Sequence, residues 1–226
     1  MDFFVEQIER GMDGVFCSKM KTQGMFLWLL AFWREFTSWF LWSGWWSSNT
    51  AYITFKNVRV PKSNLISPEN KGWSVIMNNF NHERFMMSVH SNRYSRICVE
   101  AAIQWARKRK TFGRALIENQ VVRHKIVEMV RRVEKTHAVL ENIAFMTKMG
   151  TTEKELAGLI AMTKVQATKT MEFCARESVQ IFGGRGYLRG GTGSRVERIY
   201  REVRVNAIGG GSEEIMLDLA ARQAKL

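Results

Sequence analysis

The sequence predicts a mainly α-helical protein, an antiparallel bundle of long helices preceded by a short β-structured segment. Both prolines, Pro61 and Pro68, lie in one short stretch, so the rest of the 226-residue chain lacks the residue that most strongly breaks helices. Beyond Pro68, apolar residues recur at the three- and four-residue spacing of helices. Short connections between these helical stretches favour antiparallel neighbours.

The β segment is expected within residues 1–62. Residues 3–5 and 15–21 favour strands, and residues 50–60 alternate β-branched or aromatic side chains with polar ones. Such alternation is typical of a strand with one buried face, and Pro61 would end it.

The stretch 25–44 interrupts this segment. It is almost wholly apolar, and Arg34 and Glu35 are its only charged residues. Joining Gly24 directly to Trp45 restores a strand–loop–strand pattern, so an inserted or mis-spliced segment is the favoured interpretation. A membrane-surface hairpin and a transmembrane span are the alternatives. Membrane contact through 25–44 is not favoured, because an Arg–Glu pair at the centre of a span is costly.

Residues 63–226 are expected to form the helical-bundle domain. The third helix has a clear start, because Thr151 or Thr152 can cap it and Glu153 and Glu155 fall in its first turn. The apolar spacing predicts five helices, over about 72–110, 119–149, 151–182, 193–206 and 212–225.

Two glycine clusters, at 183–186 and 209–211, stand out in this region, because glycine costs a helix about 1 kcal/mol relative to alanine. They fit either inter-helix turns with C-cap glycines or backbone that passes close to a bulky ligand. Arg189 stands where the last glycine of G-x-G-x-x-G belongs, so a Rossmann site is not supported.

Metal and thiol chemistry find little support in the sequence. His82 opens a match to H-E-x-x-H, but Met86 replaces the second histidine, and the other histidines show no ligand spacing. No metal site is therefore predicted. The cysteines are odd in number and far apart, which argues against a disulfide framework and fits a reducing, intracellular compartment. The three cysteines are Cys17, Cys98 and Cys174. The sequence does not distinguish mitochondrion, peroxisome and cytoplasm.

Several ordered motifs carry a family resemblance. They are Q-I-F-G-G-R-G-Y from Gln180, Y-R-E-V-R-V from Tyr200 and G-G-G-S-E-E-I from Gly209. They resemble the C-terminal domain of the acyl-CoA dehydrogenases. R-K-T-F-G from Arg109 resembles that family's flavin-contacting segment, and T-F-K-N-V-R-V-P from Thr54 resembles the end of its middle β domain. The likeness covers about 45–226, more weakly 1–24, and implies a C-terminal bundle with a remnant of the middle domain.

The resemblance implies a carboxylate base that removes the α-proton of an acyl-CoA while hydride leaves the β-carbon. Many relatives carry this glutamate in the C-terminal glycine segment, where this chain has Gly210. Isovaleryl- and long-chain-type relatives also have glycine there, and place the base on the first bundle helix, directly before an arginine. Here that pair is Glu83 and Arg84. The residues alone favour an exposed, ion-paired Glu83; the resemblance favours the base.

The resemblance also implies FAD as the cofactor and assigns residues to it. Arg109 would pair with the pyrophosphate. The set that would contact FAD of a neighbouring subunit is Arg109, Thr111, Phe112 and Gln120. The set along the adenosine–pyrophosphate part is Gln180, Gly183 and Gly184. Ser212 and Glu214 stand where relatives often have Thr and Gln against FAD, and an acidic Glu214 is a less favourable neighbour for phosphate.

The formal net charge of +13 is concentrated in residues 101–150, which hold eleven Lys or Arg against four Glu. Nucleic acid, an anionic membrane, a solvated helix end, and a polyanionic ligand such as a flavin dinucleotide or coenzyme A all fit this excess. Nucleic acid is disfavoured, because no aromatic residues are interleaved with the cations and no nucleic-acid motif occurs.

These features predict a fragment of an acyl-CoA dehydrogenase that catalyses FAD-dependent α,β-dehydrogenation of an acyl-CoA. The resemblance implies a homo-oligomer, a dimer or tetramer, that passes electrons to an electron-transfer flavoprotein. The alternatives are a truncated, catalytically inactive remnant that only oligomerises, an acyl-CoA oxidase, and a basic helical protein bound to membrane or nucleic acid.

Overall fold

The computed structural model describes residues 44–45, 54 and 57–226. The chain divides into two units, Met1–Asn79 and Phe80–Leu226. The described part of the first unit holds the short 3-10 helix η2 (Lys62–Asn64) and the opening turns of helix α4. The strands predicted at 3–5 and 15–21 and nearly all of the apolar stretch 25–44 lie outside the described residues.

The strand predicted up to Pro61 does not extend over residues 57–60, which form no regular structure. Asn57 has a φ of +51°, which interrupts an extended backbone. A strand also needs a neighbour to receive its hydrogen bonds, and within the described residues the only β pairing lies at 110–115.

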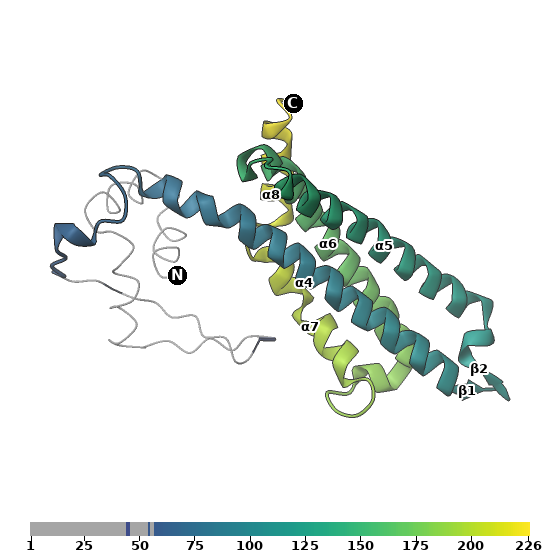
Figure 1. The fold of residues 1–226 in the computed structure, drawn as a ribbon. Helices are drawn as coiled ribbons and strands as arrows, with labels where there is room; N and C mark the ends of the chain where they lie inside the picture. The colour runs from purple at the N-terminus through teal and green to yellow at the C-terminus, as the bar shows by residue number, and fades with distance from the viewer. Residues whose placement is uncertain (1–43, 46–53, 55–56) are drawn as a thin grey trace. The chain divides into compact units, whose positions relative to one another are not determined.

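Five helices follow, at the positions that the spacing of apolar residues predicts. They are α4 (Gly72–Lys108), α5 (Gln120–Lys148), α6 (Glu153–Phe182), α7 (Ser194–Ile208) and α8 (Glu213–Gln223). The second unit is an antiparallel bundle in which α6 packs against α5, α7 and α8 (Figure 1). The prediction of a mainly helical bundle is therefore confirmed.

Helix α6 begins and ends at residues with a clear local reason. Thr152 caps it: the Thr152 hydroxyl accepts from the Glu155 N–H at 3.3 Å, and the Glu155 carboxylate accepts from the Thr152 N–H at 2.9 Å. Gly183 ends it with a φ of +61°, a conformation that favours glycine. The helix therefore delivers residues 183–187 to a fixed position at its C-terminal end.

A two-stranded hairpin connects α4 to α5. Strands β1 (Lys110–Thr111) and β2 (Arg114–Ala115) pair antiparallel, and only Phe112 and Gly113 lie between them. Both turn residues have positive φ, +50° and +79°, as a two-residue hairpin turn requires.

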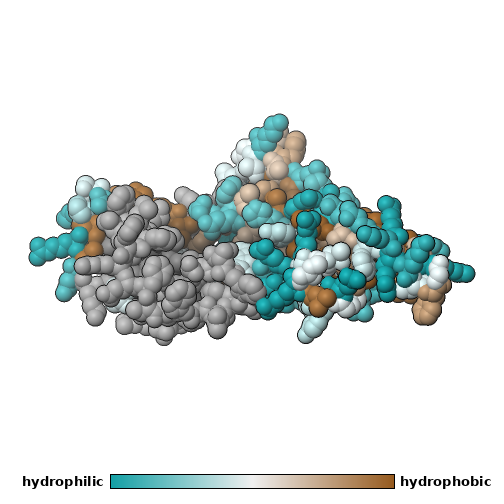
Figure 2. Space-filling view, turned by 90° about the horizontal axis from the view of Figure 1, so that it is seen from below, coloured by the Kyte–Doolittle hydropathy of each residue, from teal (hydrophilic) through white to brown (hydrophobic). Residues whose placement is uncertain are grey.

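The main core lies between α4, α5, α6 and α7, and is filled by alanine, valine, isoleucine, methionine and cysteine side chains and one phenylalanine ring. Cys98 and Ala102 of α4 meet Met129 of α5 and Cys174 of α6 there. Smaller clusters centre on Ile160 and on Met216. Outside the core the bundle surface is mostly hydrophilic with scattered hydrophobic side chains, as Figure 2 shows for one face.

Candidate functional site

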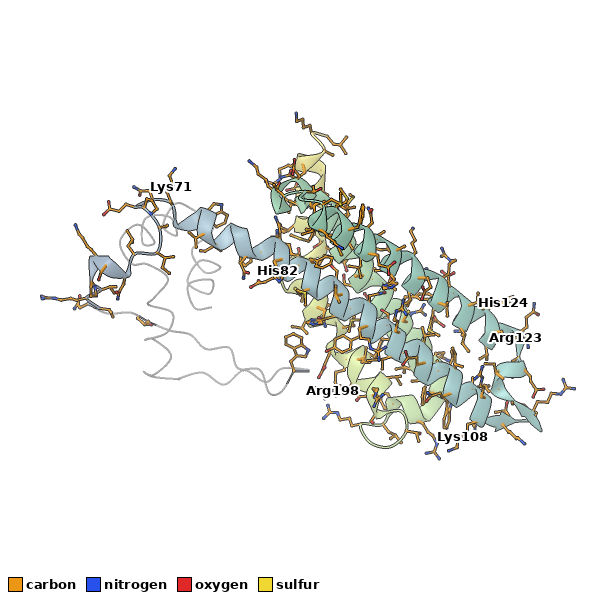
Figure 3. All side chains as sticks on the ribbon, viewed as in Figure 1. Lys71, His82, Lys108, Arg123, His124 and Arg198 are labelled. Carbon is orange, nitrogen blue, oxygen red and sulfur yellow. The ribbon has the colours of Figure 1, made fainter. Side chains whose placement is uncertain are left out.

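The residues singled out in the sequence fall into two groups along α4. Arg84 lies in its first half, whereas Lys108 ends it, and a helix that rises 1.5 Å per residue separates the two positions by about 36 Å. Figure 3 shows Lys108, Arg123 and His124 together at one end of the bundle, away from His82. We call these regions the hairpin end (residues 105–125 and 176–193) and the glycine turn (residues 209–212).

The hairpin end presents an aromatic side chain to solvent. The Phe112 side chain at the tip of the hairpin is fully exposed. The hairpin is tied to α4, because the Arg109 N–H donates to the Trp105 carbonyl and the Arg109 carbonyl accepts from the Leu116 N–H, both at 2.8 Å. An apolar ring held in water on an anchored turn suits contact with another molecule.

The glycines of the 183–193 segment serve two different purposes. A Cβ added to Gly186 would lie 2.8 Å from the Val179 carbonyl oxygen, and one added to Gly193 would lie 2.1 Å from that of Arg185. These two glycines are required by packing. A Cβ on Gly183 or Gly184 would meet nothing within 4 Å, so the backbone there is open to a ligand.

Stacked aromatic rings join the hairpin to this open backbone. Trp105 of α4 stacks on Phe182 of α6, with ring centroids 5.1 Å apart and an angle of 9° between the planes. The Arg185 guanidinium lies 5.9 Å from the Trp105 ring centroid. Phe182 directly precedes Gly183, so the stack fixes the open glycines relative to the hairpin.

Exposed cations surround this end of the bundle. They are Arg107, Lys108, Arg109, Lys110, Arg114 and Arg123. One carboxylate beneath them is buried: Glu177 of α6 pairs with Lys125 and with Arg176, the latter at 2.7 Å. The cations, the open backbone and the exposed ring together fit a ligand that carries both phosphate and planar rings. Of the predicted residues, Arg109, Thr111, Phe112, Gln120, Gln180, Gly183 and Gly184 all belong to this end.

At the glycine turn, Arg84 of α4 joins two segments far apart in the sequence. The Arg84 Nε donates to the Gly210 carbonyl at 2.8 Å. Burial lowers the pKa of Arg84, and the neighbouring Glu83 carboxylate raises it. The Glu83 side chain is exposed. Arg84, the residue directly after Glu83, therefore contacts the turn that holds Gly210.

Gly210 leaves no room for a side chain unless Met87 moves. Its φ is +67°, and an added Cβ would lie 2.9 Å from the Met87 Sδ. Met87 lies one helical turn after Glu83, on the same face of α4. The thioether therefore fills the volume that a side chain at position 210 would need.

Beyond the turn, α8 begins with three side chains of different use. The pKa of the exposed Glu214 is lowered, because its carboxylate accepts hydrogen bonds from its own backbone N–H and from the Ser212 hydroxyl. Glu213 pairs with Lys169 of α6 at 3.2 Å. The Glu214 carboxylate therefore already serves as a hydrogen-bond acceptor at the N-terminus of its own helix.

Within residues 44–45, 54 and 57–226, no group of three His, Cys, Asp or Glu side chains could hold a metal ion. In the same part of the chain, no helix combines the length and apolar character needed to cross a bilayer. Cys98 and Cys174 are free, buried thiols.

Comparison with known proteins decides the family. The model of the acyl-CoA dehydrogenase C-terminal domain matches residues 70–225. The chain belongs to the acyl-CoA dehydrogenase family. An acyl-CoA dehydrogenase of Alternaria alternata is 42% identical over 182 residues, which are 78% of this chain and 42% of that protein. Another, of Emericella nidulans, is 37% identical over 184 residues, 80% of this chain and 42% of the relative.

Solved structures of the family have the same fold. A Mycobacterium smegmatis protein assigned to the acyl-CoA dehydrogenases superposes with a TM-score of 0.79 at 34% identity, over 84% of this chain and 49% of its own. The chain thus spans somewhat less than half the length of these acyl-CoA dehydrogenases.

Sequence reasoning misses two residues that contact the glycine turn, Met87 of α4 and Lys164 of α6. A signal for Lys164 was present, because it lies four residues from both Ile160 and Thr168, on the face of α6 that is buried. A charged residue on a buried face needs a specific partner.

Proposed function

We propose that this chain is the C-terminal half of an FAD-dependent acyl-CoA dehydrogenase in which Glu83 is the general base. Membership of the family supports the reaction class. The observation that carries the assignment of the base is the Arg84–Gly210 hydrogen bond, which brings position 83 beside the turn that lacks a carboxylate.

The reaction needs one proton acceptor at this place. The Glu83 carboxylate would take the α-proton of the acyl thioester as the β-carbon gives up hydride, and a double bond forms between the two carbons. FAD, when bound, supplies the acceptor for that hydride. Arg84 would keep Glu83 and Gly210 together, because its guanidinium reaches the Gly210 carbonyl while its backbone adjoins Glu83.

Glu83 is exposed in this chain, so the site would need covering before proton transfer becomes efficient. We propose that this site is covered by the acyl chain, by the flavin and by the part of the protein that precedes this bundle in longer relatives. Expelling water in this way raises the proton affinity of a carboxylate, which suits a base near neutral pH.

FAD would use both ends of the bundle, in two copies of the chain. Arg109, Thr111, Phe112 and Gln120 would hold the FAD of a neighbouring copy, with Gln180, Gly183 and Gly184 along its adenosine–pyrophosphate part. Ser212 and Glu214 would instead face the FAD that their own copy binds. Glu214 is the least favourable of the proposed FAD contacts, because it is an acid beside phosphate. The two ends lie about 36 Å apart along α4, which is too far for one FAD molecule to contact the hairpin-end residues and the glycine-turn residues of the same copy. This separation favours a homo-oligomer.

A full-length chimera tests the proposal. The Alternaria relative would supply the N-terminal part and residues 45–226 of this chain the rest. Glu83→Gln should bind FAD and acyl-CoA but reduce flavin about 10²- to 10⁴-fold more slowly in anaerobic stopped-flow measurements. Glu100→Gln, at an exposed glutamate on the same helix, is the matched control. Normal flavin reduction by Glu83→Gln would disprove the assignment of the base.

The electron acceptor is tested in the same chimera. Turnover with an electron-transfer flavoprotein and little hydrogen peroxide would support a dehydrogenase, whereas stoichiometric peroxide would indicate an acyl-CoA oxidase. A chimera that folds and oligomerises but binds no flavin would favour the inactive remnant.

A further inference from the structure

Lys164 of α6 is the largest side chain that the described residues bury completely. A buried ammonium gives up its hydration, so it needs hydrogen-bond acceptors in return. Lysine is rarely found fully buried, and the partners of this one reveal what it does.

The Lys164 ammonium is bound to the backbone of the glycine turn. Its Nζ donates to the Ala207 carbonyl at 2.6 Å and to the Gly211 carbonyl at 2.7 Å. Ala207 lies in the last turn of α7, where carbonyls lack a partner within the helix and the helix dipole favours a cation. Lys164 therefore joins the end of α7 to the turn that follows it.

Arg84 holds the intervening carbonyl from another helix. It binds the Gly210 oxygen, whereas Lys164 binds those of Ala207 and Gly211. Gly210 and Gly211 have φ values of +67° and +118°, which favour glycine, and neither residue has a side chain that could fix the turn. Two cations, from α4 and α6, thus fix its backbone.

We propose that Lys164 is a positioning residue that holds the glycine turn so that Gly210 stays against Arg84 and beside Glu83. The inference rests on the proposed function only where it links the turn to catalysis. The structural part, that Lys164 fixes the turn, stands on the two hydrogen bonds and can be tested without flavin.

The position of the turn should depend on pH. Burial lowers the pKa of Lys164 to about 8, Glu213 on α8 raises it, and Arg84 on α4 lowers it. Glu213 is itself paired with Lys169. Opening the turn would let water reach Lys164 and return its pKa toward the ordinary value, so opening takes up a proton. Raising the pH therefore disfavours opening.

Amide hydrogen exchange in the full 226-residue chain tests this, read by NMR and corrected for the intrinsic rate at each pH. The reporters are the N–H groups of Gly209, Gly211 and Met216, which donate to the carbonyls of Val205, Ile208 and Ser212. In the wild type their protection should rise about tenfold from pH 7 to 9, whereas amides of α5 that exchange by local opening, which leaves Lys164 buried, should change far less.

Lys164→Met removes the donor but keeps the length of the side chain. At pH 7 the reporter amides should lose about tenfold in protection, because two carbonyls lose a charged donor. Their pH dependence should disappear, and the locally opening amides of α5 should keep the protection that they have in the wild type. Lys154→Met, at an exposed lysine on the same helix, should change none of these. A role confined to general stability would lower protection along α5 and α6 alike.

Equal protection of the reporter amides at pH 7 and 9 in the wild type would overturn the proposal, even if Lys164→Met fails to fold. Wild-type protection in a folded Lys164→Met would overturn it as well. In the flavin-loaded chimera, Lys164→Met should slow flavin reduction about tenfold, and an unchanged rate would remove Lys164 from catalysis. A chimera without flavin would count against the proposed function and leave the exchange result standing.

Discussion

Trp105 and Phe182 stack 5.1 Å apart, where the end of α4 meets the end of α6. The pair lies directly before both segments proposed to hold FAD, the hairpin on one side and the open glycines on the other. A substitution that weakens the stack should therefore also change the position of the hairpin and of the open glycines.

Phe182→Ala is expected to lower the free energy of unfolding by about 3–5 kcal/mol, because it removes a buried ring from the main core. Urea unfolding measures the loss. Phe145→Ala, at an exposed phenylalanine on α5, is the control and should cost much less. A double-mutant cycle with Trp105→Ala should give a coupling of about 0.5–1.5 kcal/mol. A coupling near zero would mean that the stack does not join the two helices.

Gly184→Ala should lower FAD affinity with little change in stability, whereas Gly193→Ala should lower stability. A methyl group at 184 meets open space, so stability should change little while FAD affinity of the chimera falls. A methyl group at 193 would lie 2.1 Å from a backbone carbonyl, so that variant should lose stability. Thermal unfolding and flavin titration of both variants check the contrast. Undiminished FAD binding by Gly184→Ala would place the flavin elsewhere.

Lys164 should make the stability of the chain depend on pH in a definite direction. Its folded-state pKa of about 8 lies below the ordinary lysine value of 10.5. Between these values the unfolded chain binds more protons, so the free energy of unfolding rises with pH, by up to about 1.4 kcal/mol per unit. The difference between wild type and Lys164→Met, measured by urea unfolding from pH 7 to 10.5, should show this rise. A constant difference would contradict it.

Cys174 should act in the opposite direction at higher pH. Burial raises the pKa of its thiol to about 12, above the ordinary value of 9.0. The folded chain then holds the proton where the unfolded chain has lost it, so stability is present below about pH 9 and falls above it. In a Cys17→Ser background, iodoacetamide at pH 8 should label Cys174 only upon unfolding. Rapid labelling of the folded chain would show that the thiol is accessible.

Moving the base to position 210 should require a change at Met87. Glu83→Gly with Gly210→Glu alone should stay nearly inactive, because the new Cβ would lie 2.9 Å from the Met87 Sδ. Adding Met87→Ala opens that volume and should recover part of the flavin reduction in the chimera. Met87→Ala by itself is the control. Equal recovery without the change at 87 would show that the thioether moves aside freely.

The helices could be predicted from the sequence because their signals are local. Thr152 and Glu155 form the cap expected at the start of α6, and Gly183 ends that helix. The hairpin at 110–115 could not be predicted by periodicity, since two-residue strands are too short to show a period of two. Its signal was Gly113, but the positive φ of Phe112, which the two-residue turn requires, is uncommon for a residue with a bulky side chain and is not indicated by the sequence.

The candidate site could also be predicted only in part. Family motifs indicated Glu83, Arg84 and the residues of the hairpin end as candidates, but not the partner of each side chain. Arg84 and Gly210 are 126 residues apart, and only the packing of α4 against the turn brings them together. The carbonyl acceptors of Lys164 are backbone atoms, which no pattern of side chains reveals.

The thioether of Met87 also constrains how such an enzyme can change over generations. On the proposed assignment of the base to Glu83, a lineage that carries its glutamate on α4 would gain one at the turn only where Met87 shifts or a smaller residue replaces it, because the space at 210 is occupied and the turn has a positive φ. A smaller residue at 87 would bring no catalytic benefit while the older glutamate still works. Each arrangement should therefore persist once a branch has taken it.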